Sequence, residues 1–423
     1  MRSRTLMLGL MLVGSGGVAR AVTPNCTDVG TPTAGSHLVW IQAADTQVPS
    51  LKALGAKLVA QATPITIIYT PNGSCTNLPL VYNNTDFTSN AAGGGTFYIP
   101  PGYDGTSTPP TCIAPAVGSG QKSDLGISIV FADKTDCPSL PAKPSSVAVT
   151  QGPVQAMVFA VPGGVGMNNG STQTTITAEE AYLVAGLGPT KAMVAPWDDP
   201  TYFFGRPATK GTQISIGANI GVASAKWQLI PDASHAIDQS GTVLSSIANQ
   251  ATMGNAEKTL GILGVEVYDG ARSTVHSLAF RAFKQLKSYW ADSSPTAFDK
   301  QNVRDGHYPL WSYVEYAAPQ AAAGGGALNP DAQLIIDLLS GKQVATNPAF
   351  EPIDIVIGAG LVPACAMKVQ RSVEGGDMTP ASIAEPCGCY FDFKTTGATT
   401  CTACTDDSTC GAGKCRHGYC EAR

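Results

Sequence analysis

The sequence predicts an α/β fold with mainly parallel sheets and a small disulfide-rich module at the C-terminus. Residues 37–45 and 64–70 have the apolar composition of strands, and an apolar stripe at helical spacing lies between them. A strand, a helix and a strand in succession form a βαβ unit, whose strands pair in parallel. From about residue 373 no apolar periodicity remains, and seven of the last 37 residues are cysteine. That segment cannot bury a core, so cross-links must hold it together.

The elements of the first third follow from local patterns. A helix is predicted over residues 46–63, with Asp45 or Thr46 as its cap. Residues 84–121 are rich in Gly, Pro, Ser and Thr, which predicts a long surface loop that Cys112 anchors. Apolar composition predicts two further strands, over residues 124–133 and 154–162.

A second set of elements starts at residue 177. Thr177 and Glu180 have the spacing of a capping box, which predicts a helix over residues 177–188. Asn329 and Pro330 predict another helix start, for residues 329–342. Between these helices, strands are predicted over residues 259–269 and 273–283.

Composition excludes several classes of protein. Charged residues make up 13% of the 423 residues, against about 25% in an average soluble protein. The net charge is −5 and hydrophobic residues make up 43%, so the chain is neither disordered nor a basic nucleic-acid binder. Neither Gly-x-Ser-x-Gly nor His-Glu-x-x-His occurs, and the five histidines are scattered. We therefore expect no enzyme and no cofactor.

The N-terminus has the features of a signal peptide. Arg2 and Arg4 precede an apolar stretch at residues 5–14, which is too short to span a bilayer. Ala19 and Ala21 give the small-x-small cleavage pattern, so residues 1–21 are expected to be removed. No cysteine follows directly, so no lipid anchor is indicated. The mature protein is expected to be periplasmic or secreted.

Twelve cysteines fit that destination, because disulfides form in oxidising compartments. The expected disulfide cysteines are Cys26, Cys75, Cys112, Cys137, Cys365, Cys387, Cys389, Cys401, Cys404, Cys410, Cys415 and Cys420, with their pairing left open. The alternative is a zinc site formed by the later cysteines and His417, because Cys401 and Cys404 have the Cys-x-x-Cys spacing.

The candidate site is the stretch Arg206-Pro-Ala-Thr209-Lys210-Gly211-Thr212. Arginine can hold an oxyanion in two places, and Gly211 lets backbone N–H groups approach it closely. Thr212 is a possible helix start, where free N–H groups favour an anion. The alternative is a solvated turn. A nucleotide P-loop is excluded, because its Gly-Lys-Ser/Thr order is not present. Two weaker candidates are the pair Gly73-Ser74, which is otherwise an ordinary turn, and Ser128, which is otherwise part of a strand core.

Taken together, these motifs resemble the periplasmic phosphate-binding proteins of ABC transporters, which have the type II solute-binding fold. Arg206 and Gly211-Thr212 match that family's Arg-x-x-x-Ser-Gly-Thr loop, and Gly73-Ser74 matches its Gly-Ser pair. Residues 124–128 resemble its Asp-x-Gly-Ala-Ser strand. The resemblance covers residues 38 to about 320. It implies two α/β lobes that close around a small anion such as phosphate, delivered to a permease.

The resemblance also implies a division of the chain. Residues 22–162 and 259–372 are expected to form lobe 1, residues 163–258 lobe 2, and residues 373–423 the cysteine-rich module. The chain departs from the family at the ligand site. The opening Gly-Ser-Thr becomes Ala43-Ala44-Asp45, the proton-accepting Asp becomes Ile129, and the loop Ser becomes Lys210.

Two functions are therefore open, besides an unrecognised hydrolase. The first is a solute-binding protein for ABC-type uptake or sensing, whose anion ligand would contact Arg206, Thr209, Lys210, Gly211, Thr212, Gly73, Ser74, Ser128, Asp45 and Thr46. The second is an exported structural or interaction protein that reuses the fold and contacts a surface partner through its tail. An interlobe cleft filled by Asp45 and Ile129 would favour the second.

Overall fold

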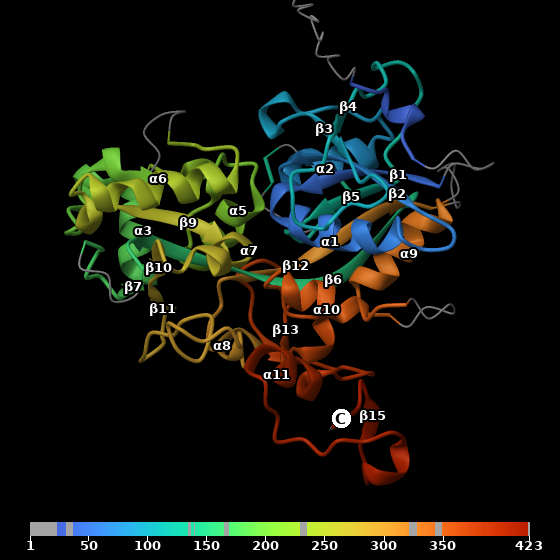
Figure 1. Cartoon of the computed structure of the whole chain (residues 1–423). Helices are drawn as coiled ribbons and strands as arrows, with labels where there is room; N and C mark the ends of the chain where they lie inside the picture. The colour runs from blue at the N-terminus through green and yellow to red at the C-terminus, as the bar shows by residue number, and fades with distance from the viewer. Residues whose placement is uncertain are drawn as a thin grey trace, which may run out of the picture.

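The structure is a computed structural model that describes residues 23–30, 37–133, 137–138, 140–164, 169–228, 235–320, 328–342 and 349–421. The expected signal peptide, residues 1–21, lies outside the described residues. Figure 1 shows two lobes side by side, with the C-terminal module below them. Within the described ranges, no helix combines the length and apolar character needed to cross a membrane.

Two strands, β6 (Val147–Pro162) and β12 (Trp311–Pro319), run between the lobes. The right-hand lobe of Figure 1 contains β1 (Leu38–Ala44), α1 (Val48–Leu58), β2 (Thr66–Asn72), α2 (Ser74–Tyr82), β3 (Thr96–Tyr98), β4 (Thr111–Cys112), β5 (Leu125–Ser128) and α9 (Pro330–Leu339). The left-hand lobe contains β7 (Thr175–Thr177), α3 (Ala178–Leu187), α4 (Pro189–Ala192), β8 (Phe203–Phe204), α5 (Gly211–Ile220), α6 (Ser240–Thr252), β9 (Leu260–Gly264), α7 (Val265–Tyr268) and β10 (Val275–Ser277). The remaining elements are β11 (Ala279–Arg281), α8 (Gln301–Arg304), α10 (Pro352–Gly358), β13 (Val369–Gln370), β14 (Thr379–Pro380), α11 (Gly388–Thr396), β15 (Lys414–Arg416) and β16 (Tyr419–Glu421).

One sheet passes through both lobes in the order β4-β3-β2-β1-β5-β12-β6-β9-β8, with β10 also paired to β6. The strands of the predicted βαβ unit pair in parallel, from Leu38 opposite Thr66 to Ala44 opposite Asn72, and β5 joins β1 in parallel. The strand β12 is antiparallel to both β5 and β6. The first part of β6 pairs with β12 and its last part pairs with β9 and β10, so this strand connects the lobes.

Local helix signals gave mixed results. The predicted capping box is present at α3, where Thr177 accepts from the Glu180 N–H and Glu180 accepts from the Thr177 N–H. The side chain of Asn329 caps α9. The predicted cap of the first helix is wrong: α1 begins at Val48 after a 3-10 turn, with no side-chain cap. Asp45 does not cap because its carboxylate is bound elsewhere, as described below.

Several predicted strands are shorter than expected. The one over 124–133 ends at Ser128, and the one over 259–269 ends at Gly264 and continues as α7. The stretch 273–283 forms two strands: β10 pairs with β6, while β11 pairs in parallel with β7. The predicted surface loop over 84–121 contributes β3 and β4 to the sheet. Each of these segments is a strand only where a neighbouring strand pairs with its backbone.

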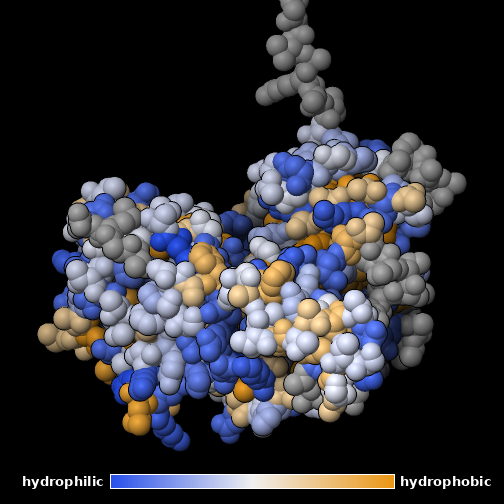
Figure 2. Space-filling view, turned by 60° about the horizontal axis from the view of Figure 1, so that its bottom comes forward, coloured by the Kyte–Doolittle hydropathy of each residue, from blue (hydrophilic) through white to orange (hydrophobic). Residues whose placement is uncertain are grey.

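The hydrophobic core is continuous through both lobes, from residues of β1 and β2 to residues of β9 and β10. Figure 2 shows apolar residues scattered over one face of the molecule, and a notch between the lobes with a hydrophilic floor.

All twelve cysteines form disulfides, which answers the question of their pairing. The pairs are Cys26–Cys112, Cys75–Cys137, Cys365–Cys387, Cys389–Cys401, Cys404–Cys415 and Cys410–Cys420. The sulfurs of Cys404, Cys410 and Cys420 lie within 4.8 Å of one another, but each is in a disulfide and offers no thiolate to zinc. The disulfides fit an oxidising compartment.

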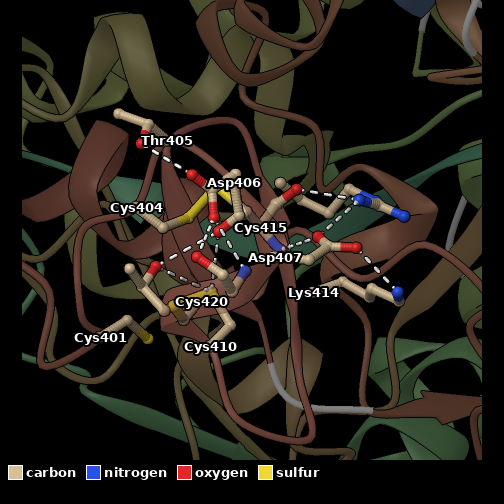
Figure 3. The surroundings of a disulfide bond; sticks show 12 residues. Cys401, Cys404, Thr405, Asp406, Asp407, Cys410, Lys414, Cys415 and Cys420 are labelled. Atoms are coloured by element: carbon tan, nitrogen blue, oxygen red, sulfur yellow. Dashed lines mark hydrogen bonds and ion pairs between the residues drawn. A yellow bond between two sulfur atoms is a disulfide. The ribbon is translucent and has the colours of Figure 1, made fainter.

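The C-terminal module combines these disulfides with turns that carboxylates hold. Figure 3 shows Asp406 and Asp407 beside the disulfides. Asp406 accepts from the Ser408 N–H at 2.9 Å, and Asp407 accepts from the Cys415 N–H at 2.9 Å and pairs with Lys414 at 2.7 Å. Such local bonds replace the hydrophobic core that the segment lacks.

The module is attached to the lobes by polar and aromatic contacts. The Arg304 side chain, 4% exposed, donates to the Ala366 carbonyl at 2.9 Å, pairs with Asp392 and lies 4.8 Å from the centre of the Phe391 ring. Asp354 of α10 accepts from the Tyr390 hydroxyl at 2.7 Å. The first helix of the module, α11, is therefore docked onto the body of the protein.

Candidate functional site

The predicted site residues come from the carboxyl ends of strands in one lobe and from the start of a helix in the other. Asp45 and Thr46 follow β1, and Ser128 ends β5. Gly73 lies between β2 and α2, and Ser74 is the first residue of α2. Arg206 follows β8, and Gly211 is the first residue of α5. The residues after β1, β2 and β5 therefore lie on one lobe, and Arg206 and Gly211 lie on the other. The two sets face each other across the contact between the lobes.

Arg206 is at the centre of this contact and is 1% exposed. Its Nη2 donates to the Asp45 carboxylate at 2.7 Å and to the Asp238 carbonyl at 2.6 Å, and its Nη1 donates to the Ser240 hydroxyl. The Ser240 hydroxyl and N–H in turn donate to the same Asp45 oxygen, at 3.0 and 3.3 Å. The Asp45 carboxylate thus receives the guanidinium and the N-terminus of α6 together, which are the groups that hold an oxyanion.

Asp45 is ionised in this environment. Burial alone raises the pKa of its carboxyl, but the positive charges of Arg206 and Lys210 outweigh burial and hold the pKa below its ordinary value. The side chain of Asp45 is 8% exposed. A permanent negative charge of the protein itself therefore lies against Arg206.

Lys210 has its own partner. Its ammonium lies 3.0 Å from a carboxylate oxygen of Asp238, although the two groups are not aligned for a hydrogen bond. We define the interlobe cluster as Asp45, Arg206, Lys210, Asp238 and Ser240. It contains two cations and two carboxylates, so its charges cancel.

The lobes also touch through backbone and apolar groups. The Cys75 N–H donates to the Thr209 carbonyl at 3.2 Å across the contact. A Cβ placed on Gly211 would lie 2.3 Å from Cγ1 of Ile129 and 2.7 Å from the Ser74 hydroxyl, so this point of the contact is filled. The Ser74 hydroxyl accepts from the Ile129 N–H at 3.1 Å. Ile129, which stands where the resembling family has a proton-accepting Asp, packs directly against the start of α5.

Not every predicted site residue reaches the interlobe cluster. The Ser128 hydroxyl exchanges hydrogen bonds with the backbone of Val130, at 3.1 and 3.2 Å, within its own loop. Thr46 is 2% exposed, and its hydroxyl has no hydrogen-bond partner among the described residues. Thr212 is 1% exposed in the first turn of α5. The ligand roles of all these residues remain predictions.

Three members of this region were missed by the sequence reasoning. Asp238 precedes α6 and Ser240 begins it, and this helix has no side-chain cap that a sequence pattern could have revealed. Glu266 follows β9 and accepts from Gln155 at 2.8 Å, while Gln155 accepts from Gln47 at 2.5 Å. Burial, followed by the negative charge of Asp45, raises the pKa of Glu266 well above its ordinary value.

A second segment closes the lobes from another side. The Glu374 carboxyl accepts from the Phe131 N–H in the right-hand lobe. Next to it, a Cβ on Gly375 would lie 2.6 Å from the Ala218 carbonyl of α5 in the left-hand lobe. The residues between β13 and β14 therefore contact both lobes.

Comparisons with known proteins find a distant likeness to solved structures. No protein-family model matches the chain, and no curated protein matches it. A protein described as a phosphate ABC transporter substrate-binding protein, solved with bound phosphate from Clostridium perfringens, is 11% identical; it covers 77% of this chain and 99% of its own, with a TM-score of 0.48. An ABC-type phosphate transport receptor from Vibrio cholerae is 11% identical, over 77% of this chain and 99% of its own, with a TM-score of 0.44. A phosphate-binding protein from Stenotrophomonas maltophilia is 9% identical, over 80% of this chain and 92% of its own, with a TM-score of 0.42.

Each of these neighbours is described as a phosphate-binding or phosphate-transport protein. At TM-scores below 0.5 and about a tenth of residues identical, they do not decide what this chain binds. The charges and contacts of the interlobe cluster are the better guide to what this chain binds.

Proposed function

We propose that this chain is an exported protein of solute-binding architecture whose lobes close without a small anion, and that it acts through protein contacts, including its cysteine-rich module. The observation that carries the proposal is the ion pair between Asp45 and Arg206, 2.7 Å long and almost fully buried. The carboxylate takes the place and the charge that an oxyanion ligand would have. Closure then needs no ligand, because the protein supplies the anion itself.

Charge supports this function over phosphate capture. A phosphate anion brings one or two negative charges into a site whose two cations are already matched by two carboxylates. A buried charge without a partner is strongly unfavourable. Phosphate would bind only after Asp45 had left Arg206 and reached water.

A second candidate function is capture of a small anion, phosphate or a similar oxyanion, for a permease or sensor. It is favoured by unused hydrogen-bonding capacity at the cluster. Among the described residues, the Nε of Arg206 and the hydroxyl of Thr46 have no hydrogen-bond partner. The start of α5 also offers free backbone N–H groups. This function requires the ligand to displace Asp45.

The test is to titrate phosphate into the mature protein and into its Asp45→Ser variant by calorimetry, with sulfate and chloride as comparisons. We expect no heat with the unchanged protein. In Asp45→Ser the guanidinium of Arg206 loses its partner, which costs about 3–5 kcal/mol of stability. Phosphate should then bind, and it should raise the unfolding temperature of the variant by mass action. Asp45→Ser combined with Arg206→Gln is the matched control and should not respond.

Each outcome separates the two functions. Micromolar phosphate binding by the unchanged protein would overturn the proposal and establish anion capture. An Asp45→Ser variant that is as stable as the unchanged protein and does not respond to phosphate would mean that Asp45 does not replace an anion. Binding by Asp45→Ser alone supports the proposal.

A further inference from the structure

A cavity of about 440 Å³ lies beside the β13–β14 hairpin, away from the interlobe cluster. Its wall includes Asp133 from the loop after β5, Gln151 from β6 and Glu315 from β12. The hairpin segment contributes Arg371, Ser372 and Asp377. The volume is within the range of small-molecule sites. An adjoining hollow of about 530 Å³ shares Asp133, Gln151 and Glu315, so there is room beyond the cavity for a ligand's side chain.

The unusual group in this wall is Arg371, which is 5% exposed. Its Nη1 donates to the Pro309 carbonyl at 3.0 Å, and the guanidinium carbon lies 3.9 Å from the centre of the Trp311 ring. Its Nε and Nη2 have no acceptor among the described residues. Each buried polar group without a partner costs about 1–3 kcal/mol, and more when it is charged. The guanidinium of Arg371 therefore has capacity for a further hydrogen-bond acceptor at Nε and Nη2.

Glu374 is the nearest internal candidate for that acceptor, but it does not serve. One of its carboxyl oxygens accepts from the Phe131 N–H, and the other has no partner among the described residues. Burial raises the pKa of this carboxyl to about 8, against the opposing effects of the Phe131 N–H and of Arg371. Burial lowers the pKa of Arg371 to about 9, against the opposing charge of Glu374.

Three other residues of the wall are acidic, and the rest are uncharged. Asp133 and Asp377 are exposed, and Glu315 accepts from the Ala132 N–H at 2.6 Å and from Gln151 at 3.3 Å. A simple anion would be attracted by Arg371 and repelled by these carboxylates. A cation would be attracted by the carboxylates and repelled by Arg371. A molecule that carries both charges, separated by a few bonds, offers an anion to Arg371 and a cation to the carboxylates.

We propose that this cavity binds a compact zwitterion, such as a free amino acid, with its carboxylate on Arg371 and its ammonium group facing Asp133 and Asp377. The Nε and Nη2 atoms of Arg371 are covered by neighbouring atoms. Binding therefore includes a small shift of the β13–β14 hairpin. Each strand of that hairpin has only two residues, so a shift breaks few backbone bonds. The site is separate from the Asp45–Arg206 pair and does not depend on whether phosphate binds there.

The experiment is calorimetry with the full mature protein at pH 7. The probes are L-alanine, L-glutamine and γ-aminobutyrate, and the one-charge comparisons are propionate and ethylamine. At least one zwitterion should bind, and both one-charge compounds should bind at least tenfold more weakly. Arg371→Gln should weaken zwitterion binding at least tenfold. Asp377→Asn changes an exposed residue and should also weaken it, which keeps the test valid if Arg371→Gln does not fold.

Asp45→Ser is the comparison variant, because it alters the interlobe cluster and Asp45 does not line this cavity. Equal loss of zwitterion binding in Asp45→Ser would place the ligand between the lobes and overturn the proposal. Propionate binding as tightly as the zwitterions would identify a plain anion site instead. No heat from any probe would also overturn it, and the acceptor for Arg371 would then be water or Glu374.

Discussion

Replacing Gly211 with alanine tests whether the two lobes meet as closely in solution as in the structure. The new Cβ would lie 2.3 Å from Cγ1 of Ile129 and 2.7 Å from the Ser74 hydroxyl, whereas ordinary contact begins near 3.4 Å. Overpacking of this kind costs about 1–3 kcal/mol, and alanine recovers at most about 1 kcal/mol of helix propensity. We expect a net loss of roughly 1–2 kcal/mol in the free energy of unfolding, measured by urea denaturation.

Gly241 is the matched control, because it also lies in the first turn of a helix and a Cβ there meets nothing within 4 Å. Gly241→Ala should be neutral or stabilising by up to about 1 kcal/mol. Adding Ile129→Ala to Gly211→Ala removes the closest clash, so the two changes should couple by about 1 kcal/mol. If Gly211→Ala is as stable as Gly241→Ala and shows no coupling to Ile129→Ala, the lobes do not close on each other here.

Three further predictions concern other parts of the molecule. In the folded state the pKa of Glu374 is raised from 4.5 to about 8, so between these pH values the native state holds one proton more than the unfolded state. The free energy of unfolding should therefore fall by up to about 1.4 kcal/mol per pH unit from pH 5 to 8. Thermal melts of Glu374→Gln should show a smaller dependence of stability on pH over this range. Replacing Cys26 and Cys112 by serine frees an 86-residue loop and should cost about 4–5 kcal/mol in urea denaturation. Arg304→Ala removes the cation that pairs with Asp392 of α11 and should cost about 1.5–3 kcal/mol, seen as faster proteolysis of residues 388–421 with the lobes intact.

The sequence predicted those elements whose signals are local. The βαβ unit, the capping box at Thr177 and the cap at Asn329 each depend on residues within one or two turns. The interlobe strand β12 was not predicted, because Glu315 in its centre is unusual for a buried strand. Its carboxylate is tolerated there because it accepts from the Ala132 N–H. The first half of β6 was also not predicted, because Gly152 and Pro153 indicate a turn. In the structure both residues lie within the strand, at an irregularity in its pairing with β12.

The candidate site was predictable only in part. Residue types and the family resemblance brought Arg206, Lys210 and Asp45 into one hypothesis, and the structure places them together. They did not reveal that Asp238 and Ser240 complete the partners of the two cations, because α6 begins 34 residues after Arg206 and no short pattern links them. The full pairing of the two cations with the two carboxylates arises only when the two lobes come together.

The buried ion pair sets a limit on how tightly the unchanged protein can bind an anion between its lobes. An anion competes with Asp45, so only molecules in which Asp45 has left Arg206 can bind it. Breaking a buried pair costs about 3–5 kcal/mol, so at a cost of about 3 kcal/mol roughly one molecule in 160 would be competent. The apparent affinity falls by the same factor, and a site with micromolar intrinsic affinity would show a Kd above about 100 μM. Asp45→Ser should therefore bind phosphate at least about a hundredfold more tightly than the unchanged protein, and a smaller difference would mean that Asp45 leaves Arg206 at little cost.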